Sequence, residues 1–398
     1  MDFRFGPEDE AFRQEARAWL DEHLAGDFAA ARGRGGPGSE HEGGEARRAW
    51  ERELGKGGWI GLGWNAEFGN RVAGLTQQVV WAEEYARAKA PGRYGHIGEN
   101  LLAPTLLAYG SEEQKARFLP PIARGEELWC QGYSEPDAGS DLAGLRTSAV
   151  RDGDTYRITG QKIWTSLAHD ADWCFVLART EEGSSRHHGL SFLLVPMDQP
   201  GRIEVRPIRQ LTGTSEFNEV FFDGAVADAA HVVGGAGNGW GVAMGLLGFE
   251  RGVSTLVQQI GFAEELALVV QDALEAGAVA DPVVRERLVR QWAELRAMRF
   301  NALRTLGSSE PDAGAPSVAK LLWGSWHRRL GELAMQVRGV AAAIGPGDWS
   351  AQTPYELDAM QRLFLFTRAD TIYGGSDEIQ RNIIAERVLG LPKEPKGS

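Results

Sequence analysis

Residues 133–141 read Tyr-Ser-Glu-Pro-Asp-Ala-Gly-Ser-Asp, and residues 160–166 read Gly-Gln-Lys-Ile-Trp-Thr-Ser. Between them, residues 150–158 contain an Asp-Gly pair flanked by strand-forming residues, which predicts two strands joined by a tight turn. The two stretches are therefore separated by about one β-hairpin. They place small hydroxyl side chains, backbone amides and one indole where a flat, electron-accepting ring could be held. Taken alone, the first stretch is also typical of a surface turn, because its residue types favour turns.

The composition limits the class of protein. With 398 residues, the chain exceeds the usual size of one compact core, so two or three packed units are expected. A net charge of -13 argues against nonspecific nucleic-acid binding. The two cysteines, Cys130 and Cys174, give no disulfide framework, and the histidines show no metal-binding spacing. No apolar run is long enough for a membrane span, and the N-terminus is too charged for a signal peptide, so a cytoplasmic protein is expected.

The apolar periodicity predicts helices at both ends of the chain. Helical spacing is found in the N-terminal part at residues 7–24, 50–54, 75–88 and 111–119. Long amphipathic patterns return in the C-terminal part at residues 240–275, 282–306, 317–340 and 355–372. Four long helices with short connections predict a helical bundle.

The middle of the chain has the period of β-strands instead. Further strands are expected at residues 172–180, 189–197, 202–208 and 216–222. They indicate a small antiparallel β unit, a barrel or a sandwich. The predicted fold class is therefore α+β and mostly α. We expect an N-terminal helical domain (1–126), a middle β domain (127–234) and a C-terminal four-helix-bundle domain (235–398).

A third stretch, residues 373–382, reads Tyr-Gly-Gly-Ser-Asp-Glu-Ile-Gln-Arg-Asn. Together with the first two stretches, it resembles the signature of the acyl-CoA dehydrogenase family, in its bacterial form. Matching stretches run from about residue 7 to about residue 391, nearly the whole chain. The resemblance implies the three-domain fold and an FAD cofactor held between the β unit and the bundle. It also implies an acyl-CoA substrate and transfer of electrons to an electron-transfer flavoprotein.

The resemblance assigns site residues by motif position. Those implied to bind the cofactor are Gln131, Tyr133, Ser134, Trp164, Thr165, Ser166, Ser376 and Glu378. Ser134 and Ser166 would donate hydrogen bonds near the N5–O4 edge of the flavin, and Trp164 would stack on the face opposite the substrate. Those implied to contact the substrate are Ser140, Phe249, Arg251, Tyr373 and Gly374. For Trp164 taken alone, packing in the core is the alternative.

The family reaction needs a carboxylate base to remove a proton from Cα of the thioester. Many members carry this base directly after the tyrosine of the C-terminal motif, where this chain has Gly374. A second family pattern places the base on a bundle helix, directly before an arginine, and Glu250 precedes Arg251. Glu250 is therefore the predicted base, with a solvated surface charge as the alternative. The Gly374 amide would stabilise the enolate oxygen, and glycine there leaves room for a bulky or branched acyl group.

The chain departs from the family where one subunit completes its neighbour's FAD site. Family homotetramers use an arginine after the first bundle helix and a glutamine before a Gly-Gly-x-Gly turn. This chain has Ala276 in the first place and Gln336-Val337-Arg338-Gly339 in the second. We therefore expect a heteromer with a related subunit. The alternative is a homo-oligomer, a tetramer or dimer, in which Arg285 or Arg287 holds the pyrophosphate.

Three other functions are compatible with parts of this sequence. A flavin monooxygenase of the same fold would generally lack a base, so Glu250 argues against it. A non-catalytic partner subunit would not need its own flavin-binding and catalytic residues, so the intact Trp164, Ser134 and Glu250 argue against it. A biosynthetic dehydrogenase acting on a carrier-protein thioester stays open.

Overall fold

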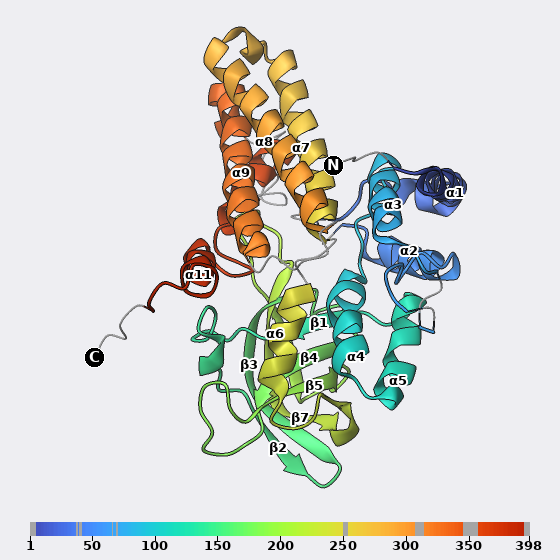
Figure 1. Cartoon of the computed structure of the whole chain (residues 1–398), viewed down its shortest axis with the longest axis vertical. Coiled ribbons are helices and arrows are strands. Elements are labelled where there is room, and N and C mark those ends of the chain that lie inside the picture. The colour runs from blue at the N-terminus through green and yellow to red at the C-terminus, as the bar shows by residue number, and fades with distance from the viewer. Residues whose placement is uncertain are drawn as a thin grey trace. The chain divides into compact units, whose positions relative to one another are not determined.

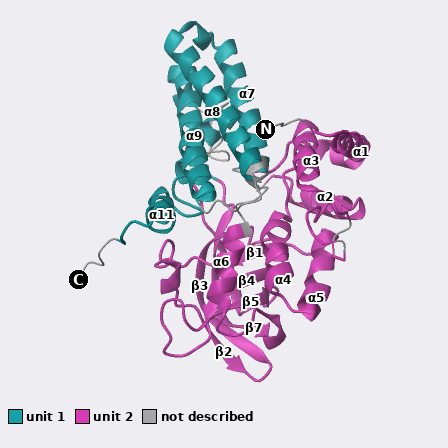
Figure 2. Cartoon of the chain, viewed as in Figure 1, with its two compact units in different colours: residues 1–4, 211–213, 253–398 teal, residues 5–210, 214–252 magenta. Residues whose placement is uncertain are grey.

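The computed structural model describes residues 5–36, 39, 42–65, 67–68, 71–249, 254–306, 314–344 and 357–393. The chain separates into two compact units (Figure 2). Unit 2 comprises residues 5–210 and 214–252, and unit 1 comprises residues 253–398 with residues 1–4 and 211–213. Over the described ranges, none of the helices combines the length and apolar composition that crossing a bilayer requires.

The N-terminal part of unit 2 is helical (Figure 1). Its helices are α1 (Pro7–His23), α2 (Gly44–Lys56), α3 (Leu75–Arg87), α4 (Ala103–Tyr109) and α5 (Glu112–Ala123), with a π turn at Gly98–Leu102. Pro7 opens α1 because its fixed φ suits the first turn, where no N–H partner is needed. Trp50 and Trp81 pack with α1 in one shared core. The predicted N-terminal helices are confirmed.

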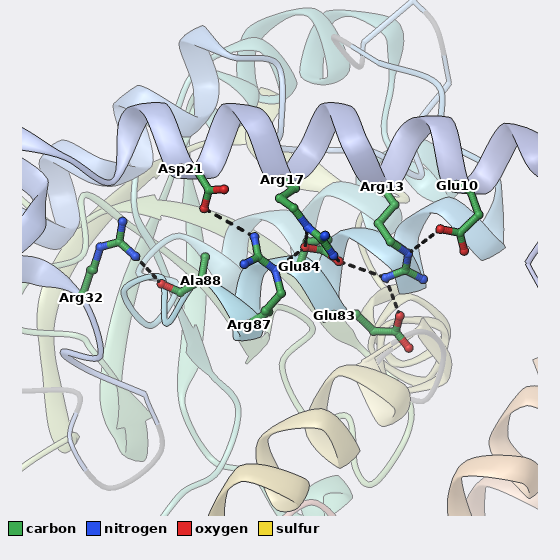
Figure 3. Close-up of polar contacts among 9 residues, drawn as sticks. All are labelled: Glu10, Arg13, Arg17, Asp21, Arg32, Glu83, Glu84, Arg87 and Ala88. Atoms are coloured by element: carbon green, nitrogen blue, oxygen red, sulfur yellow. Dashed lines mark hydrogen bonds and ion pairs between the residues drawn. The ribbon is translucent and has the colours of Figure 1, made fainter.

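A charged cluster joins α1 to α3 (Figure 3). Glu84 on α3 is only 2% exposed. Its carboxylate accepts hydrogen bonds from Arg13 and Arg17 of α1 and from Arg87 of α3, at 2.5 to 3.1 Å. Burial alone would raise the pKa of Glu84, but the arginines outweigh it and lower this pKa to about 2. The carboxylate therefore stays charged at physiological pH and fixes α1 on α3.

Unit 2 continues as an eight-stranded sheet within the described residues. The strands are β1 (Trp129–Gly132), β2 (Ser148–Asp152), β3 (Thr155–Ser166), β4 (Trp173–Arg179), β5 (Leu190–Pro196), β6 (Ile203–Pro207), β7 (Phe217–Asp228) and β8 (Val232–Val233). Their order is β6-β7-β3-β2-β4-β5-β8, with β1 beside β4. Most pairs are antiparallel, as predicted, but β1 and β2 each pair with β4 in parallel. Alternation of side chains indicates burial and carries no strand direction, so the sequence did not reveal these parallel pairs.

The segment predicted as one bundle helix, residues 240–275, forms two helices, α6 (Gly239–Phe249) and α7 (Ser254–Glu275). The residues between them, 250–253, lie outside the described ranges, and α6 belongs to unit 2 while α7 belongs to unit 1. Val242 and Leu246 of α6 are buried in one cluster with Phe192 of β5. A periodic pattern identifies an apolar face but does not show which core that face joins.

Unit 1 is a four-helix bundle, as predicted. The helices α7, α8 (Pro282–Leu306), α9 (Ala315–Arg338) and α10 (Ala359–Phe366) contribute buried side chains to one cluster. Helix α11 (Asp377–Ile383) follows α10. The last bundle helix is shorter than predicted, because the chain enters a 3-10 turn at Thr367–Ala369. The mostly α, α+β fold class is confirmed, and the division at residues 126 and 234 stays a prediction.

Candidate active site

The turn after β1 lies against β3. Backbone hydrogen bonds join Glu135 and Ala138 in both directions, at 3.1 and 3.0 Å, and close a tight turn. Directly before this turn, the carbonyl of Ser134 accepts a hydrogen bond from the amide of Ile163 at 2.9 Å. The two signature stretches of the middle domain are therefore adjacent in the structure.

A buried ion pair fixes this turn. Lys162 of β3 is fully buried, and its ammonium donates to Glu135 Oε1 at 2.8 Å and to the carbonyl of Tyr133 at 3.0 Å. The Glu135 carboxylate also accepts from the amides of Arg146 and Thr147, at 2.6 and 2.9 Å. Burial opposes ionisation of Glu135, but the charge of Lys162 outweighs it and lowers the pKa of this carboxyl. Both charges are hydrogen-bonded as well as paired, which a buried ion pair needs.

Sequence reasoning missed this pair, although β3 carried a signal. Tyr156, Ile158 and Lys162 have the same parity along the strand, and all three are buried. A lysine on the buried face of a strand is rare unless a carboxylate pairs with it. Glu135 lies in the other signature stretch, which the sequence separates from this strand by about one hairpin, and its carboxylate is the partner that such a lysine needs.

A β-bulge turns Trp164 outward. Between the pairs Lys162–Val220 and Thr165–Asn218, β3 has one residue more than β7. Trp164 has a left-handed backbone with φ of 60°, which is rare for an aromatic residue, and its side chain is 56% exposed. Strained backbone of this kind gathers at functional sites, where the surrounding structure imposes it. The bulge thus presents an indole face on which a flat ring could stack.

The bulge also separates the roles of the next two residues. Thr165 is fully buried, and its carbonyl accepts a hydrogen bond from Asn218 at 3.0 Å. Ser166 is half-buried, as is Ser134 on the neighbouring segment. In the described part of the chain, no hydrogen bond involves the hydroxyl of either serine. The structure therefore encloses Thr165 and leaves two serine hydroxyls available to a ligand near Trp164.

Three other predicted residues of unit 2 differ in exposure. Tyr133 is 5% exposed and packs edge-on against Phe175 and Phe192, with ring centroids 5.9 and 6.2 Å apart. Gln131 on β1 is half-buried, and Ser140 is exposed after the turn. The Tyr133 ring therefore belongs to the core beneath the turn, and Ser140 lies on the surface.

Unit 1 carries the C-terminal signature on a second turn. Gly374 and Gly375 have left-handed backbones, with φ of 64° and 83°. Both glycine carbonyls accept hydrogen bonds from Gln380 of α11, at 3.3 and 3.2 Å. The Tyr373 hydroxyl donates to Asp370 Oδ1 at 2.7 Å. Within the described residues, no hydrogen bond from the Gly374 amide is found.

The two remaining predicted cofactor residues open α11. The Ser376 hydroxyl caps this helix by accepting from the amide of Ile379 at 3.4 Å. Glu378 lies in the first turn and is exposed, where a carboxylate is favoured by the helix dipole. Both side chains thus have a local structural role.

The predicted base falls between α6 and α7. Glu250 and Arg251 lie outside the described residues, as does the side chain of Phe249. The roles assigned to these three residues stay predictions.

The positions at which the chain departs from the family pattern lie in the bundle. Ala276 directly follows the end of α7. Arg338 donates to Asp272 Oδ2 at 2.5 Å, and Arg287 donates to Gln336. The polar side chains near the altered Gly-Gly-x-Gly turn therefore have partners within their own bundle.

Comparison with protein families covers the chain in three consecutive parts. Residues 6–126 match the N-terminal domain of acyl-CoA dehydrogenase, residues 130–225 the middle domain and residues 237–389 the C-terminal domain. The chain belongs to the acyl-CoA dehydrogenase family. The predicted family and enzyme class are thereby confirmed, and members of this family are FAD-dependent flavoproteins.

Two curated relatives of this acyl-CoA dehydrogenase match along nearly their whole length. Acyl-CoA dehydrogenase IpdE1 of Mycobacterium tuberculosis is 59% identical over 98% of this chain and 99% of its own length. IpdE1 of Mycolicibacterium smegmatis is 57% identical over 97% of this chain and 98% of its own length.

Solved structures match equally completely. The Tcur3481-Tcur3483 steroid ACAD is 31% identical with a TM-score of 0.84, over 99% of this chain and 100% of that one. The ChsE4-ChsE5 complex from Mycobacterium tuberculosis is 29% identical with a TM-score of 0.80, over the same shares. Both descriptions name two proteins in one assembly.

Proposed function

We propose that this acyl-CoA dehydrogenase binds FAD and uses it to oxidise the Cα–Cβ bond of an acyl-CoA thioester. The observation that carries the proposal is the outward Trp164, held by a bulge in a strained backbone beside the hydroxyls of Ser134 and Ser166. An exposed indole with two available hydroxyl donors fits a flat ring that has polar atoms at one edge. Bound FAD would supply the acceptor for the hydride that leaves Cβ.

Residues of unit 2 would cover the flavin ring, donate hydrogen bonds to it and hold these donors in place. Trp164 would cover one ring face, and Ser134 and Ser166 would donate to the polar edge. The buried Glu135–Lys162 pair would hold Ser134 in place, because it fixes the turn that follows this serine.

Glu250 would take the proton from Cα. Support comes from the sequence, since Gly374 has no side chain at the other position that the family uses and Glu250 precedes an arginine on the chain. A general base of this kind contributes roughly 10²- to 10⁴-fold to a rate.

The amide of Gly374 would donate to the thioester oxygen as negative charge develops on it. Support comes from the turn itself, where this amide has no partner among the described residues. The left-handed φ of 64° explains why glycine stands there.

We further propose a bulky acyl group with rings, such as one derived from a steroid. A Cβ built on Gly374 would meet nothing nearer than Lys320 Cε at 3.8 Å, so the turn leaves space on its own unit. The solved relative described as a steroid ACAD supports the same substrate class. An electron-transfer flavoprotein would then take the electrons.

Anaerobic mixing with CoA thioesters tests the activity. Bleaching of the flavin absorption by a steroid-type acyl-CoA is expected, with slower bleaching by straight-chain esters. Glu250→Gln should keep its FAD and bleach about a thousandfold more slowly. The exposed Glu182→Gln is the matched control and should behave as the wild type. Fast reoxidation of the reduced protein by air would favour a monooxygenase instead.

A heteromer with a related subunit is the proposed assembly. Ala276 and the altered turn after Gln336 support it, as do the two-protein descriptions of the solved relatives. The FAD-to-chain ratio after purification without a partner is the test. A ratio near zero that co-expression of a related subunit restores would support the heteromer. A ratio of about one for the chain alone would contradict it.

A further inference from the structure

Unit 1 contains a buried histidine that the proposed reaction does not use. His327 of α9 is 3% exposed. Its Nδ1 lies 2.8 Å from Asp370 Oδ2, and its Nε2 lies 2.7 Å from Glu265 Oε2 of α7. Carboxylates accept and do not donate, so both contacts are hydrogen bonds only when both ring nitrogens carry protons. The geometry therefore requires an imidazolium between two carboxylates.

The surroundings favour this charged form. Burial on its own would lower the pKa of His327, but the hydrogen bonds to Asp370 and Glu265 and the charges of these carboxylates raise it to about 9. The groups that face the ring are these two carboxylates and Phe262, whose ring is tilted by 38° to the imidazole with 4.2 Å between ring centroids. The bridge is thus complete at neutral pH.

Asp370 connects this bridge to the turn of the C-terminal signature. Asp370 is fully buried, and its second carboxylate oxygen accepts from the Tyr373 hydroxyl at 2.7 Å. Its carbonyl accepts from the ammonium of Lys320 at 2.5 Å. Helix α9 approaches closely here, since a Cβ on Gly324 would lie 3.0 Å from that carbonyl. The residue three positions before Tyr373 is therefore held at both its side chain and its backbone.

The far side of the same turn is held by α11. Gln380 is 1% exposed and donates to the carbonyls of Gly374 and Gly375. The amide of Asp377 donates to the carbonyl of Thr371 at 3.1 Å and closes the loop. With the carbonyls fixed from α11, the orientation of the Gly374 amide depends on where Asp370 and Tyr373 lie.

We propose that His327 is a positioning residue, which bridges Glu265 to Asp370 and thereby fixes the turn that presents the Gly374 amide. This inference rests on the proposed function for its effect on catalysis. Loss of the imidazolium proton would remove the ring's hydrogen bond to one of the two carboxylates, and the bridge that anchors the turn would be broken. Because misplacement of a reacting group by about 1 Å can cost roughly 100-fold in rate, kcat should respond more than KM.

The first test is His327→Gln in the full-length protein with its FAD. Glutamine carries both of its N–H donors on one nitrogen, so it cannot bridge two carboxylates that face different ring nitrogens as the imidazolium does. We expect unchanged FAD content, a roughly 10- to 100-fold lower kcat and a KM within about threefold of the wild type. The wild type should lose kcat with a midpoint near pH 9, and the variant should lack this step. The exposed His188→Gln is the matched control and should keep both kcat and the alkaline step.

A second, more conservative variant distinguishes loss of the bridge from a general folding defect in His327→Gln. Glu265→Gln keeps a hydrogen-bond acceptor but removes one charge, so the alkaline midpoint should fall by about one pH unit while kcat at pH 6 falls less than in His327→Gln. An alkaline step that neither His327→Gln nor Glu265→Gln moves would overturn the inference.

A readout that does not need turnover separates this inference from the proposed function. Hydrogen–deuterium exchange of the peptide covering residues 369–381 should speed up in His327→Gln, with α8 unchanged. Unchanged exchange in this peptide would overturn the positioning role, whatever the activity. A wild type that oxidises no acyl-CoA, combined with faster exchange in the variant, would refute the proposed function and leave the anchor intact.

Discussion

The turn at residues 135–138 in unit 2 and the turn at residues 370–376 in unit 1 are both anchored by buried charges, but the two anchors differ in chemistry. Glu135 and Lys162 form an ion pair whose carboxyl group has a lowered pKa. His327 forms a bridge that exists only while the ring holds a second proton. One anchor should therefore be insensitive to pH near neutrality, and the other should weaken on the alkaline side.

The largest expected effect breaks the anchor of unit 2. Lys162→Met leaves Glu135 buried without its counter-charge, which should cost about 3 to 5 kcal/mol of unfolding free energy. FAD content should fall with it, since the turn after Ser134 loses its anchor. Urea unfolding followed by circular dichroism measures the unfolding free energy, and visible absorption measures the FAD content.

Lys56→Met is the control, because Lys56 is exposed and its loss should change stability by less than about 0.5 kcal/mol. A Lys162→Met protein as stable as this control would show that the buried pair does not anchor the turn.

The stability that the His327 bridge contributes to unit 1 should depend on pH. His327 has its pKa raised from 6.5 to about 9, so its stabilising contribution is complete below pH 6.5 and is lost as pH rises through 9. The shift corresponds to about 3 kcal/mol. Thermal midpoints of the wild type and His327→Gln should therefore differ most at pH 6 and converge by pH 10. A difference that stays constant over this range would contradict a titrating bridge.

The cluster around Glu84 sharpens the comparison, because it joins two helices and anchors no signature turn (Figure 3). Glu84→Gln should cost about 1 to 2 kcal/mol, a modest loss because Arg17 and Arg87 are partly in water. FAD content should not change. The lowered pKa means that the contribution is complete above pH 4.5 and is lost as pH falls towards 2, so wild type and variant should converge in acid. Loss of FAD in this variant would show that destabilisation alone empties the site.

The smallest effect tests the turn of unit 1 without touching its anchor. Alanine at 374 must adopt a φ of 64°, so Gly374→Ala should cost about 1 kcal/mol of stability. The added methyl group would occupy substrate space, so kcat/KM for bulky acyl-CoA esters should fall more than for straight-chain esters. Equal losses for both classes would point to backbone strain alone.

The sequence predicted the elements well where one period runs unbroken. The predicted helix at 282–306 agrees with α8, which begins at Pro282 and is helical up to Leu306, where the described range ends. The orientation of Trp164 did not follow from the period, because continued alternation from Lys162 would have buried this indole. One extra residue in β3 reverses the parity, so Trp164 is exposed and Thr165 is buried. A bulge leaves no mark in composition, so the motif alone suggested the outward indole.

The sequence did not predict the buried His327 bridge, for a different reason. His327 lies on the same apolar face of α9 as Trp323 and Leu330, where a single polar residue is easily dismissed. Its two partners come from other elements, Glu265 from α7 and Asp370 from the segment after α10. Local patterns do not show which distant carboxylates meet on one ring, and that pairing needed the three-dimensional structure.

The order of the two units along the chain has a consequence for synthesis. Apart from residues 1–4 and 211–213, unit 2 is encoded entirely ahead of unit 1. Domains generally fold as units and the N-terminal one folds first as the chain leaves the ribosome. The sheet that carries Trp164 and the buried Glu135–Lys162 ion pair can therefore form while the bundle is still being translated. During synthesis, the strand that presents the Trp164 indole would therefore fold before the turn of the C-terminal signature.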